Sequence, residues 1–383
     1  MTQTVDYLGN LIEFPTVNAN SNLPMIAFLR EFLQKRGFDV YQIDDPDEEK
    51  AGLFASIGPP VDGGVLLSGH TDVVPTEGQN WSYPEFTMTQ VGDRVYGRGT
   101  TDMKGFVASM LTAADIASKT RLKKPLKLSL SYDEEIGCVG IKHMIDQLAE
   151  TVGKPAFAIV GEPTSMNIAI GHKGKSAIRA ICKGDNGHSA LAPNFVNALH
   201  VATDFVTALR ELQIELSVRG AQDDAYTVPY STVHVGKMSG GMALNMVPPE
   251  AVIDFEFRHL AADKSEDLMG TISELAQKVE SQHKKLSPNA EIVLEPMNSY
   301  PGLDTPEDHD VISQVQRLSD NSATIKVGYG TEAGYFSGLG VPTIVCGPGS
   351  MQEQGHKPDE YILLEQLNLC DNMMQNLIRT LTD

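Results

Sequence analysis

The amino-acid sequence predicts an α/β protein in which a mostly parallel sheet, with helices on its faces, is interrupted by an inserted α+β domain. Three observations favour this fold class. Short apolar runs alternate with helical patterns over roughly the first 170 residues, apolar and polar residues alternate in the middle of the chain, and the first pattern resumes near residue 323. Alternating strands and helices are typical of a parallel sheet covered on both faces. A length of 383 residues suits two domains of ordinary size.

The sequence pattern in the first part of the chain predicts an amphipathic helix, three buried strands and a buried helix. Apolar residues recur at helical spacing from Leu23 to Phe38, and Gly37 ends that helix. The Ala-rich segment 105–118 predicts the second helix. Apolar runs that each end in a polar cluster predict strands at 64–72, 126–135 and 157–163. In a parallel sheet, the reactive groups gather beyond the carboxyl ends of such strands.

The middle of the chain has the pattern of an antiparallel sheet with one wet face. The predicted strands lie at 176–182, 232–238 and 251–258, and helical patterns accompany them at 194–212 and 265–283. The first pattern returns in the apolar runs 323–329 and 342–349 and in a closing helix. We therefore expect residues 1–173 and 296–383 to form one interrupted domain, and residues 174–295 to form an inserted domain.

Composition argues against several classes of protein. The chain has 30 Lys and Arg against 50 Asp and Glu, a formal charge of −20. Phosphate binding needs clustered basic residues, so we expect no nucleic-acid partner and no anionic membrane partner. No apolar run approaches the ~20 residues of a membrane span, and the amino terminus does not have the pattern of a secretory signal. Four widely spaced cysteines suit a reducing cytoplasm.

Imidazole and carboxylate side chains follow the predicted strands, where a parallel sheet presents its reactive edge. These residues are His70, Asp72, Asp102, Glu134, Glu135, Glu162 and His356. Carboxylates gathered at one edge raise one another's pKa unless cations compensate them. Mixed histidine and carboxylate ligands suit Zn²⁺, Co²⁺ or Mn²⁺, and no cysteine is suitably placed. The pattern therefore indicates a divalent metal site.

Each of these residues also has an ordinary structural interpretation. Residues 133–135 have the composition of a solvated acidic turn, Glu162 that of a helix cap, and His356 that of a surface histidine in a glycine-rich loop. The recurrence at positions 70, 102 and 134, which are 32 residues apart each time, favours a shared site. The glycines at 97–99 and 347–350 give only weak dinucleotide and phosphate signals, and no GxSxG elbow supports a serine nucleophile.

Five ordered stretches are similar to the co-catalytic zinc family that contains acetylornithine deacetylases, succinyl-diaminopimelate desuccinylases, aminoacylases and carboxypeptidases. They are SGHTDVVP at 68–75, GRGTTDMKG at 97–105, DEEIGCVG at 133–140, GEP at 161–163 and the late His356. The resemblance spans nearly the full chain. It implies a metallopeptidase-type catalytic domain whose insertion falls where this family has its smaller dimerisation, or lid, domain. Within the family, the stretch 329–362 most resembles the acetylornithine deacetylases.

The resemblance also implies two divalent metal ions per chain, most readily Zn²⁺, with Co²⁺ as a further candidate. It makes His70 and Glu162 ligands of one metal and Glu135 and His356 ligands of the other, with Asp102 as the bridge. Two further roles follow for neighbouring carboxylates. Asp72 would accept the second N–H of the His70 imidazole, and Glu134 would be the general base. A cis peptide between Asp102 and Met103 is a further expectation from the family.

The resemblance also assigns roles in substrate binding and oxyanion stabilisation to four other residues. His188 would stabilise the oxyanion, reaching the site of the partner subunit in a homodimer, although a loop histidine is commonly structural. Arg258 would bind the substrate α-carboxylate, or else form a surface salt bridge. Asn245 would contact substrate, or only precede a turn. Glu332 would meet a cationic amine of the substrate, or support a glycine-rich turn.

The expected activity is hydrolysis of N2-acetyl-L-ornithine to L-ornithine and acetate, a step of arginine biosynthesis. This expectation rests on the resemblance, because spacing alone indicates only a metal-dependent amidohydrolase. The nearest alternatives are N-succinyl-diaminopimelate desuccinylase, another N-acyl-amino-acid hydrolase and a dipeptidase of the same family. A remote alternative is a binding protein without activity, and the intact ligand and base positions argue against it.

Overall fold

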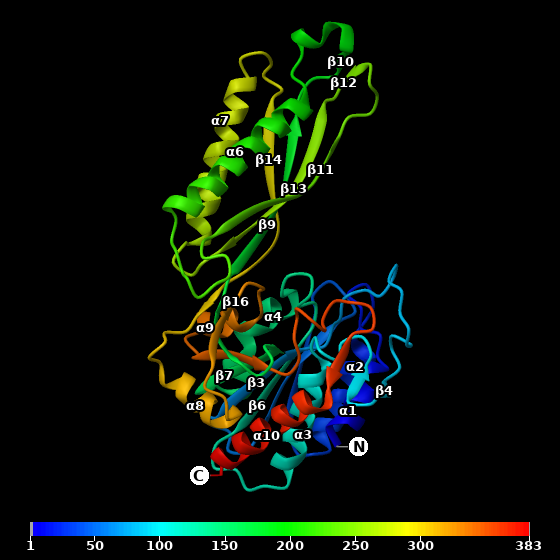
Figure 1. Ribbon diagram of the computed structural model, residues 1–383, viewed down its shortest axis with the longest axis vertical. Helices are drawn as coiled ribbons and strands as arrows, with labels where there is room; N and C mark the ends of the chain where they lie inside the picture. Colours follow the sequence, from blue (N-terminus) through cyan, green and yellow to red (C-terminus); the bar gives the residue numbers. More distant parts are fainter. Residues whose placement is uncertain (1–2, 383) are drawn as a thin grey trace. The chain divides into compact units, whose positions relative to one another are not determined.

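A computed structural model describes residues 3–382 and divides the chain into two compact units (Figure 1). The first unit comprises the chain up to Gly171 together with Leu303–Val327 and the part from Thr331 onward. The second comprises His172–Gly302 and Gly328–Gly330. The expected boundary at 295–296 falls inside strand β14 (Glu291–Tyr300), which belongs entirely to the second unit. That strand was not among those predicted from the sequence, so the expected boundary came too early.

A nine-stranded mixed sheet forms the centre of the first unit, with the path β1-β2-β6-β3-β7-β17-β8-β15 and β16 paired to β8. Its strands are β1 (Asp39–Asp44), β2 (Ala51–Ile57), β3 (Val65–His70), β6 (Leu126–Ser131), β7 (Phe157–Pro163), β8 (Ile168–His172), β15 (Leu303–Asp304), β16 (Thr324–Val327) and β17 (Thr343–Gly347). The central strands β6, β3, β7 and β17 are parallel, whereas β1, β2 and β8 pair antiparallel with their neighbours. The predicted α/β fold with a mixed, mostly parallel sheet is confirmed.

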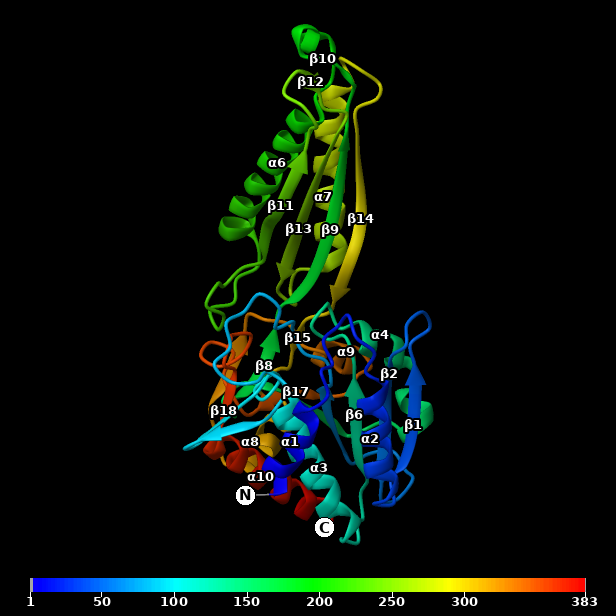
Figure 2. The ribbon, with the colours of Figure 1, turned by 90° about the vertical axis from the view of Figure 1, so that its right-hand side faces the viewer.

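Helices cover both faces of this sheet (Figure 2). They are α1 (Gln3–Ile12), α2 (Leu23–Gln34), α3 (Lys104–Ser118), α4 (Val139–Met144), α5 (Leu148–Val152), α8 (Asp310–Ser319), α9 (Ala333–Gly338) and α10 (Leu364–Thr380). Helices α1, α2, α3, α8 and α10 share one apolar core with alternate strand residues such as Leu53 and Leu67. On the opposite face, Gly52 lies against Met144 of α4. A 3-10 turn, Ile145–Gln147, links α4 to α5, and a small sheet is formed by β4 (Thr89–Val91), β5 (Arg94–Tyr96) and β18 (Tyr361–Leu363).

Gly161 allows α3 to approach β7 closely. A Cβ atom at this position would lie 1.9 Å from the ring of Phe106, so only glycine fits without a shift of the helix. Close packing here matters for the site, because Glu162 follows Gly161 in β7 and Asp102 lies just before α3. The helix and the strand therefore hold these two carboxylates in a defined relation.

The second unit is an α+β module. Its four-stranded antiparallel sheet has the order β11-β13-β9-β14, with β9 (Gly174–Lys183), β11 (Thr232–Gly240) and β13 (Glu250–His259) beside β14. Burial alternates along β13, because one face of the sheet packs against α6 (Ala198–Arg219) and α7 (Ser265–His283) in a second apolar core. Strands β10 (Gly187–His188) and β12 (Met246–Val247) form a separate antiparallel pair. A 3-10 segment, Ser189–Asn194, follows β10 directly.

Two structural observations bear on the expectations drawn from composition. Within residues 3–382, no helix combines the length and apolar character that crossing a membrane requires. The four cysteines, Cys138, Cys182, Cys346 and Cys370, are buried and form no disulfide.

Candidate metal centre

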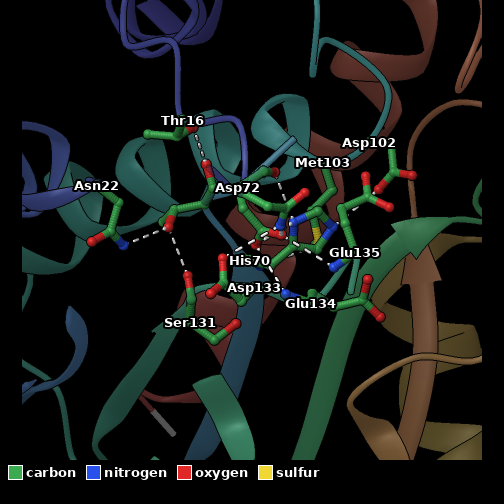
Figure 3. Close-up of polar contacts among 12 residues, drawn as sticks. Thr16, Asn22, His70, Asp72, Asp102, Met103, Ser131, Asp133, Glu134 and Glu135 are labelled. Atoms are coloured by element: carbon green, nitrogen blue, oxygen red, sulfur yellow. Dashed lines mark hydrogen bonds and ion pairs between the residues drawn. The ribbon is translucent and has the colours of Figure 1, made fainter. Parts of the chain in front are cut away.

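The parallel strands place several of the predicted site residues at one edge of the sheet. His70 is the last residue of β3 and pairs in register with Ser131, the last residue of β6. The sequence pattern predicted a strand as far as residue 135, but β6 ends at Ser131. Asp133 adopts a left-handed backbone with a φ of 52°, and Glu134 and Glu135 follow it beyond the end of β6, close to Asp72 (Figure 3).

His70, Asp102 and Glu162 form a first group of potential metal ligands, all three of them buried. The His70 Nε2 atom lies 3.0 Å from Asp102 Oδ1 and 3.7 Å from Glu162 Oε1. Among residues 3–382, no hydrogen-bond donor reaches Glu162 Oε1, although this oxygen is fully buried. A buried carboxylate oxygen of this kind needs a positive partner.

Asp102, Glu135 and His356 form a second group. The His356 Nε2 atom lies 3.0 Å from Asp102 Oδ2 and 3.0 Å from Glu135 Oε2. Asp102 thus faces the first group with one carboxylate oxygen and the second group with the other. His356 comes from the loop after β17, and its side chain is 42% exposed. The expected cis peptide between Asp102 and Met103 is present.

The carboxylates at this edge oppose each other's ionisation. Burial raises the pKa of Glu162 well above its usual value, and the charge of Asp102 adds to the rise. Burial likewise raises the pKa of Glu135 to about 7, with Asp102 again adding to the shift. Hydrogen bonds with Asp102 and Glu135 raise the pKa of His356 to about 10. A divalent cation would relieve this repulsion, so the two groups fit divalent metal ions in both ligand type and charge.

Asp72 connects His70 to the turn that bears the two glutamates. The Nδ1 atom of His70 lies 3.0 Å from the main-chain carbonyl of Asp72 and 3.4 Å from its carboxylate. A carbonyl only accepts, so Nδ1 carries the proton and Nε2 keeps its lone pair for a metal. The Asp72 carboxylate in turn accepts the main-chain N–H groups of Glu134 and Glu135, each at 3.1 Å. The expected contact is therefore shared between the carbonyl and the carboxylate.

Glu134 lies beside the two ligand groups and belongs to neither. Its side chain is half-buried, and its Oε1 atom accepts a hydrogen bond from the Cys138 thiol at 3.4 Å. Burial raises its pKa well above the usual value; His70 opposes this shift and Glu135 adds to it. A carboxyl group with a raised pKa next to two ligand groups has the properties of a proton-transfer residue.

Comparison with known proteins agrees with this arrangement. The family model "Peptidase family M20/M25/M40" matches residues 66–380. The chain belongs to this family. An acetylornithine deacetylase of Klebsiella pneumoniae is 35% identical over 360 residues, which cover 92% of this chain and 91% of that protein. An acetylornithine deacetylase of Salmonella arizonae is 34% identical over 359 residues, with the same coverage of each chain. The resemblance drawn from the five motifs is thereby confirmed.

Solved structures of the M20 family show the same fold. An M20 metallo-carboxypeptidase of Sulfolobus solfataricus superposes with a TM-score of 0.80 at 18% identity, covering 99% of each chain. A tripeptidase of Staphylococcus aureus superposes with a TM-score of 0.78 at 19% identity, covering 99% of this chain and 98% of the other. Identities this low establish the fold alone. The M20 chain described here is accordingly a hydrolase with candidate metal-binding groups at the expected sheet edge.

The remaining predicted site residues of this M20 chain belong to neither ligand group. Glu332 precedes α9 and is only 1% exposed, and its Oε2 atom accepts a hydrogen bond from Ser68 at 3.2 Å. Burial raises its pKa to about 7. Its role, either contact with a cationic amine of the substrate or support of the glycine-rich turn, remains a prediction.

Three further predicted residues lie in the second unit, and their substrate roles remain predictions. The exposed His188 accepts the N–H of Ala190 at Nδ1. Asn245 is also exposed. The Nε atom of Arg258 donates to Glu256 Oε1 at 3.0 Å, which is the ion pair that the sequence left open as an alternative.

Several residues around the M20 site were not found by sequence reasoning. They are Asn18, Lys50, Asp133, Arg98 and Glu360. The motifs GRGTTDMKG and DEEIGCVG contain two of them, and charged residues inside such motifs were an available signal. Asn18 and Lys50 lie before residue 66, where the family match begins, and nothing in their local pattern distinguishes them.

Proposed function

We propose that this chain is an acetylornithine deacetylase, which hydrolyses N2-acetyl-L-ornithine to L-ornithine and acetate. One observation supports the chemistry above all: Asp102 turns one carboxylate oxygen to each of two ligand groups, and Glu134 stays outside both. The curated relatives at 35% and 34% identity support the choice of substrate.

The proposed metal ligands are the two groups that share Asp102. His70 and Glu162 would hold one divalent ion, and Glu135 and His356 the other, with Zn²⁺ preferred and Co²⁺ as the alternative. Two such ions, when bound, lower the pKa of a water molecule and polarise a carbonyl oxygen. Histidine and carboxylate donors without a thiolate are consistent with either metal.

Glu134 would move the proton in the reaction. Its carboxylate takes a proton from the attacking water, whose oxygen adds to the amide carbonyl carbon. The carbon–nitrogen bond then breaks, and Glu134 returns the proton to the leaving amine nitrogen. One water is consumed, and acetate and the amine are released, the amine taking up the proton that the new carboxyl group loses. The turn whose main chain Asp72 holds presents both glutamates, and only Glu135 belongs to a ligand group, so Glu134 would stay free to exchange a proton.

The second unit would supply substrate contacts. Arg258 lines a cavity of about 170 Å³ together with Lys173, Tyr226 and Thr232, and a guanidinium there suits an α-carboxylate. We propose that Asn245 forms a polar contact with the substrate. In a homodimer, His188 would stabilise the oxyanion that forms on the substrate in the site of the partner subunit. Arginine biosynthesis in the cytoplasm is the setting that this activity would have.

Turnover of a defined substrate panel tests the proposal. The purified protein, loaded with Zn²⁺ or Co²⁺, is offered N2-acetyl-L-ornithine, N-succinyl-diaminopimelate, other N-acetyl amino acids and dipeptides. The highest kcat/KM is expected for acetylornithine. Faster hydrolysis of succinyl-diaminopimelate or of a dipeptide would replace the proposed substrate while keeping the amidohydrolase chemistry. Absence of turnover on every compound would favour the binding protein without activity.

A further inference from the structure

The segment that follows α1 lies alongside the end of β3. Val17 and Val73 form a parallel bridge, and the main-chain N–H of Val73 donates to the carbonyl of Thr16 at 3.0 Å. The Thr16 hydroxyl donates to the Thr71 carbonyl at 2.5 Å (Figure 3). These bonds fix the segment 16–18 next to His70 and Asp72. The segment precedes the part of the chain that the family model matches.

Asn18 places one amide group between two carboxylates. Its Nδ2 atom donates to Asp72 Oδ2 at 2.9 Å and to Asp133 Oδ1 at 3.3 Å. Asp72 and Asp133 are both buried, so they would repel each other strongly without a donor between them. The same Asp72 carboxylate accepts the N–H groups of Glu134 and Glu135. Asn18 is therefore linked to the backbone of both glutamates through two successive hydrogen bonds that share the Asp72 carboxylate.

Lys50 supplies the positive charge of this cluster. Its Nζ atom donates to Asp133 Oδ2 at 2.6 Å and to the main-chain carbonyl of Asn18 at 2.6 Å. The side chains of Lys50 and Asp133 are each only 6% exposed. The further contact of Lys50, with Glu48 at 2.8 Å, involves a carboxylate that is 60% exposed. The buried contacts of the Lys50 ammonium group are therefore those with Asp133 and with the main chain at Asn18.

We propose that Asn18, supported by Lys50, is a positioning residue for the metal centre and the general base. Through Asp72 and Asp133 it fixes the turn in which Glu134 and Glu135 stand side by side, and through Asp72 it also fixes the ring of His70. The roles of these residues rest on the proposed function. A shift of Asp72 would displace a metal ligand from each group and the base together, so the effect reaches metal binding as well as turnover.

Variants of Asn18 test the proposal. Asn18→Asp keeps the shape but replaces the donor by a third carboxylate, and Asn18→Ala removes the donor. Asn20→Ala is the matched control, because Asn20 lies in the same loop, is exposed, and donates its side-chain amide to the Pro15 carbonyl at 3.0 Å rather than to a carboxylate of the cluster. The measurements are metal affinity of the metal-free protein by chelator competition, kcat and KM on the best substrate, and the unfolding temperature.

We expect Asn18→Asp to lower metal affinity and kcat by about 10- to 100-fold. KM is expected to change by less than about threefold, because the substrate contacts lie elsewhere. Asn20→Ala should match the wild type. The double variant Asn18→Ala/Lys50→Met should lose less metal affinity and kcat than the product of the fold-changes of the two single variants, since both residues act through Asp133.

Several results would overturn the proposal. One such result is that both Asn18 variants keep the metal affinity and kcat of the wild type. Another is that Asn20→Ala loses as much metal affinity and kcat as the Asn18 variants do. A lowered unfolding temperature with unchanged affinity and kcat would assign Asn18 to stability alone. If Asn18→Asp does not fold, Asn18→Ala and Lys50→Met decide, and failure of all three to fold also counts against a positioning role. Metal affinity needs no substrate, so this test stands even if the wild type hydrolyses nothing in the panel.

Discussion

Glu360 accepts a hydrogen bond from the main-chain N–H of Asp102 at 3.1 Å, although the two residues are 258 positions apart. The same Oε1 atom accepts the N–H of Thr101 at 2.9 Å, and Oε2 forms an ion pair with the fully buried Arg98 at 2.7 Å. The main chain of Asp102, whose carboxylate both ligand groups share, is thus held by Glu360. The charge of Glu360 is paired with Arg98 outside both ligand groups.

Glu360→Gln is expected to weaken metal binding by about 10- to 100-fold. Glutamine can still accept from the backbone with its oxygen, but its NH₂ group would face Arg98, and the buried guanidinium would lose the carboxylate that neutralises it. Chelator competition on the metal-free protein measures the effect. Glu353→Gln, at an exposed position between β17 and β18, is the control. Unchanged affinity in Glu360→Gln would mean that Asp102 keeps its place without this contact.

Glu134→Gln should lower kcat by about 10²- to 10⁴-fold while the metal content stays at the wild-type level. The amide cannot take a proton from water, and Glu134 belongs to neither ligand group. Glu135→Gln is the matched comparison, because it should reduce metal content instead. Elemental analysis and steady-state kinetics on both variants separate the two roles. Loss of metal from Glu134→Gln would make it a ligand.

His356→Ala is expected to reduce bound metal from two ions per chain to one. His356 belongs only to the second ligand group, whereas His70, Asp102 and Glu162 remain together in the first. Asp102→Asn should weaken both sites, because each group uses one of its oxygens. Titration of the metal-free proteins with Zn²⁺, followed by elemental analysis, counts the ions. Equal stoichiometry in the two variants would contradict the shared role of Asp102.

Asp371→Asn should stabilise the protein more at pH 7 than at pH 4. Burial raises the pKa of Asp371, and hydrogen bonds from Thr4 and Ser109 only partly oppose this. A raised folded-state pKa means that the carboxyl group favours folding at pH values below its unfolded pKa, and that this contribution is lost as the pH rises through the folded-state value. Unfolding temperatures at both pH values measure the difference. The exposed Asp47→Asn controls for the loss of one charge, and an equal difference at both pH values would disprove the effect.

The strand ends were predictable because their signals are local. An apolar run followed by a polar cluster identifies a buried strand and its end, and the carboxyl ends of neighbouring parallel strands meet at one edge. The positions of His70 and Glu162 follow from this rule, whereas the strand predicted to residue 135 ends earlier, at Ser131. Strand β14 was not predicted, and the domain boundary was therefore placed inside it.

Contacts between distant segments were not predictable in the same way. Asn18 meets Asp72 across 54 positions, Lys50 meets Asp133 across 83, and Asp102 meets Glu360 across 258. The local sequence around an asparagine in a loop or a lysine before a strand does not identify the residues that it will contact, since hydrogen bonds between segments form only when the whole chain folds.

The sequence by itself determined the family, the mixed parallel sheet and the identity of the candidate metal ligands, because each of these depends on short patterns read in order along the chain. The family resemblance already implies that Asp102 is the bridge and that Glu134 has a separate role. Only the tertiary structure decided which distant residues hold these carboxylates and the backbone around them: the half-buried Asn18 and the buried Lys50, Arg98 and Glu360. The physical reason is that carboxylates crowded at one sheet edge repel each other, and the donors that hold them come from parts of the chain that meet only on folding.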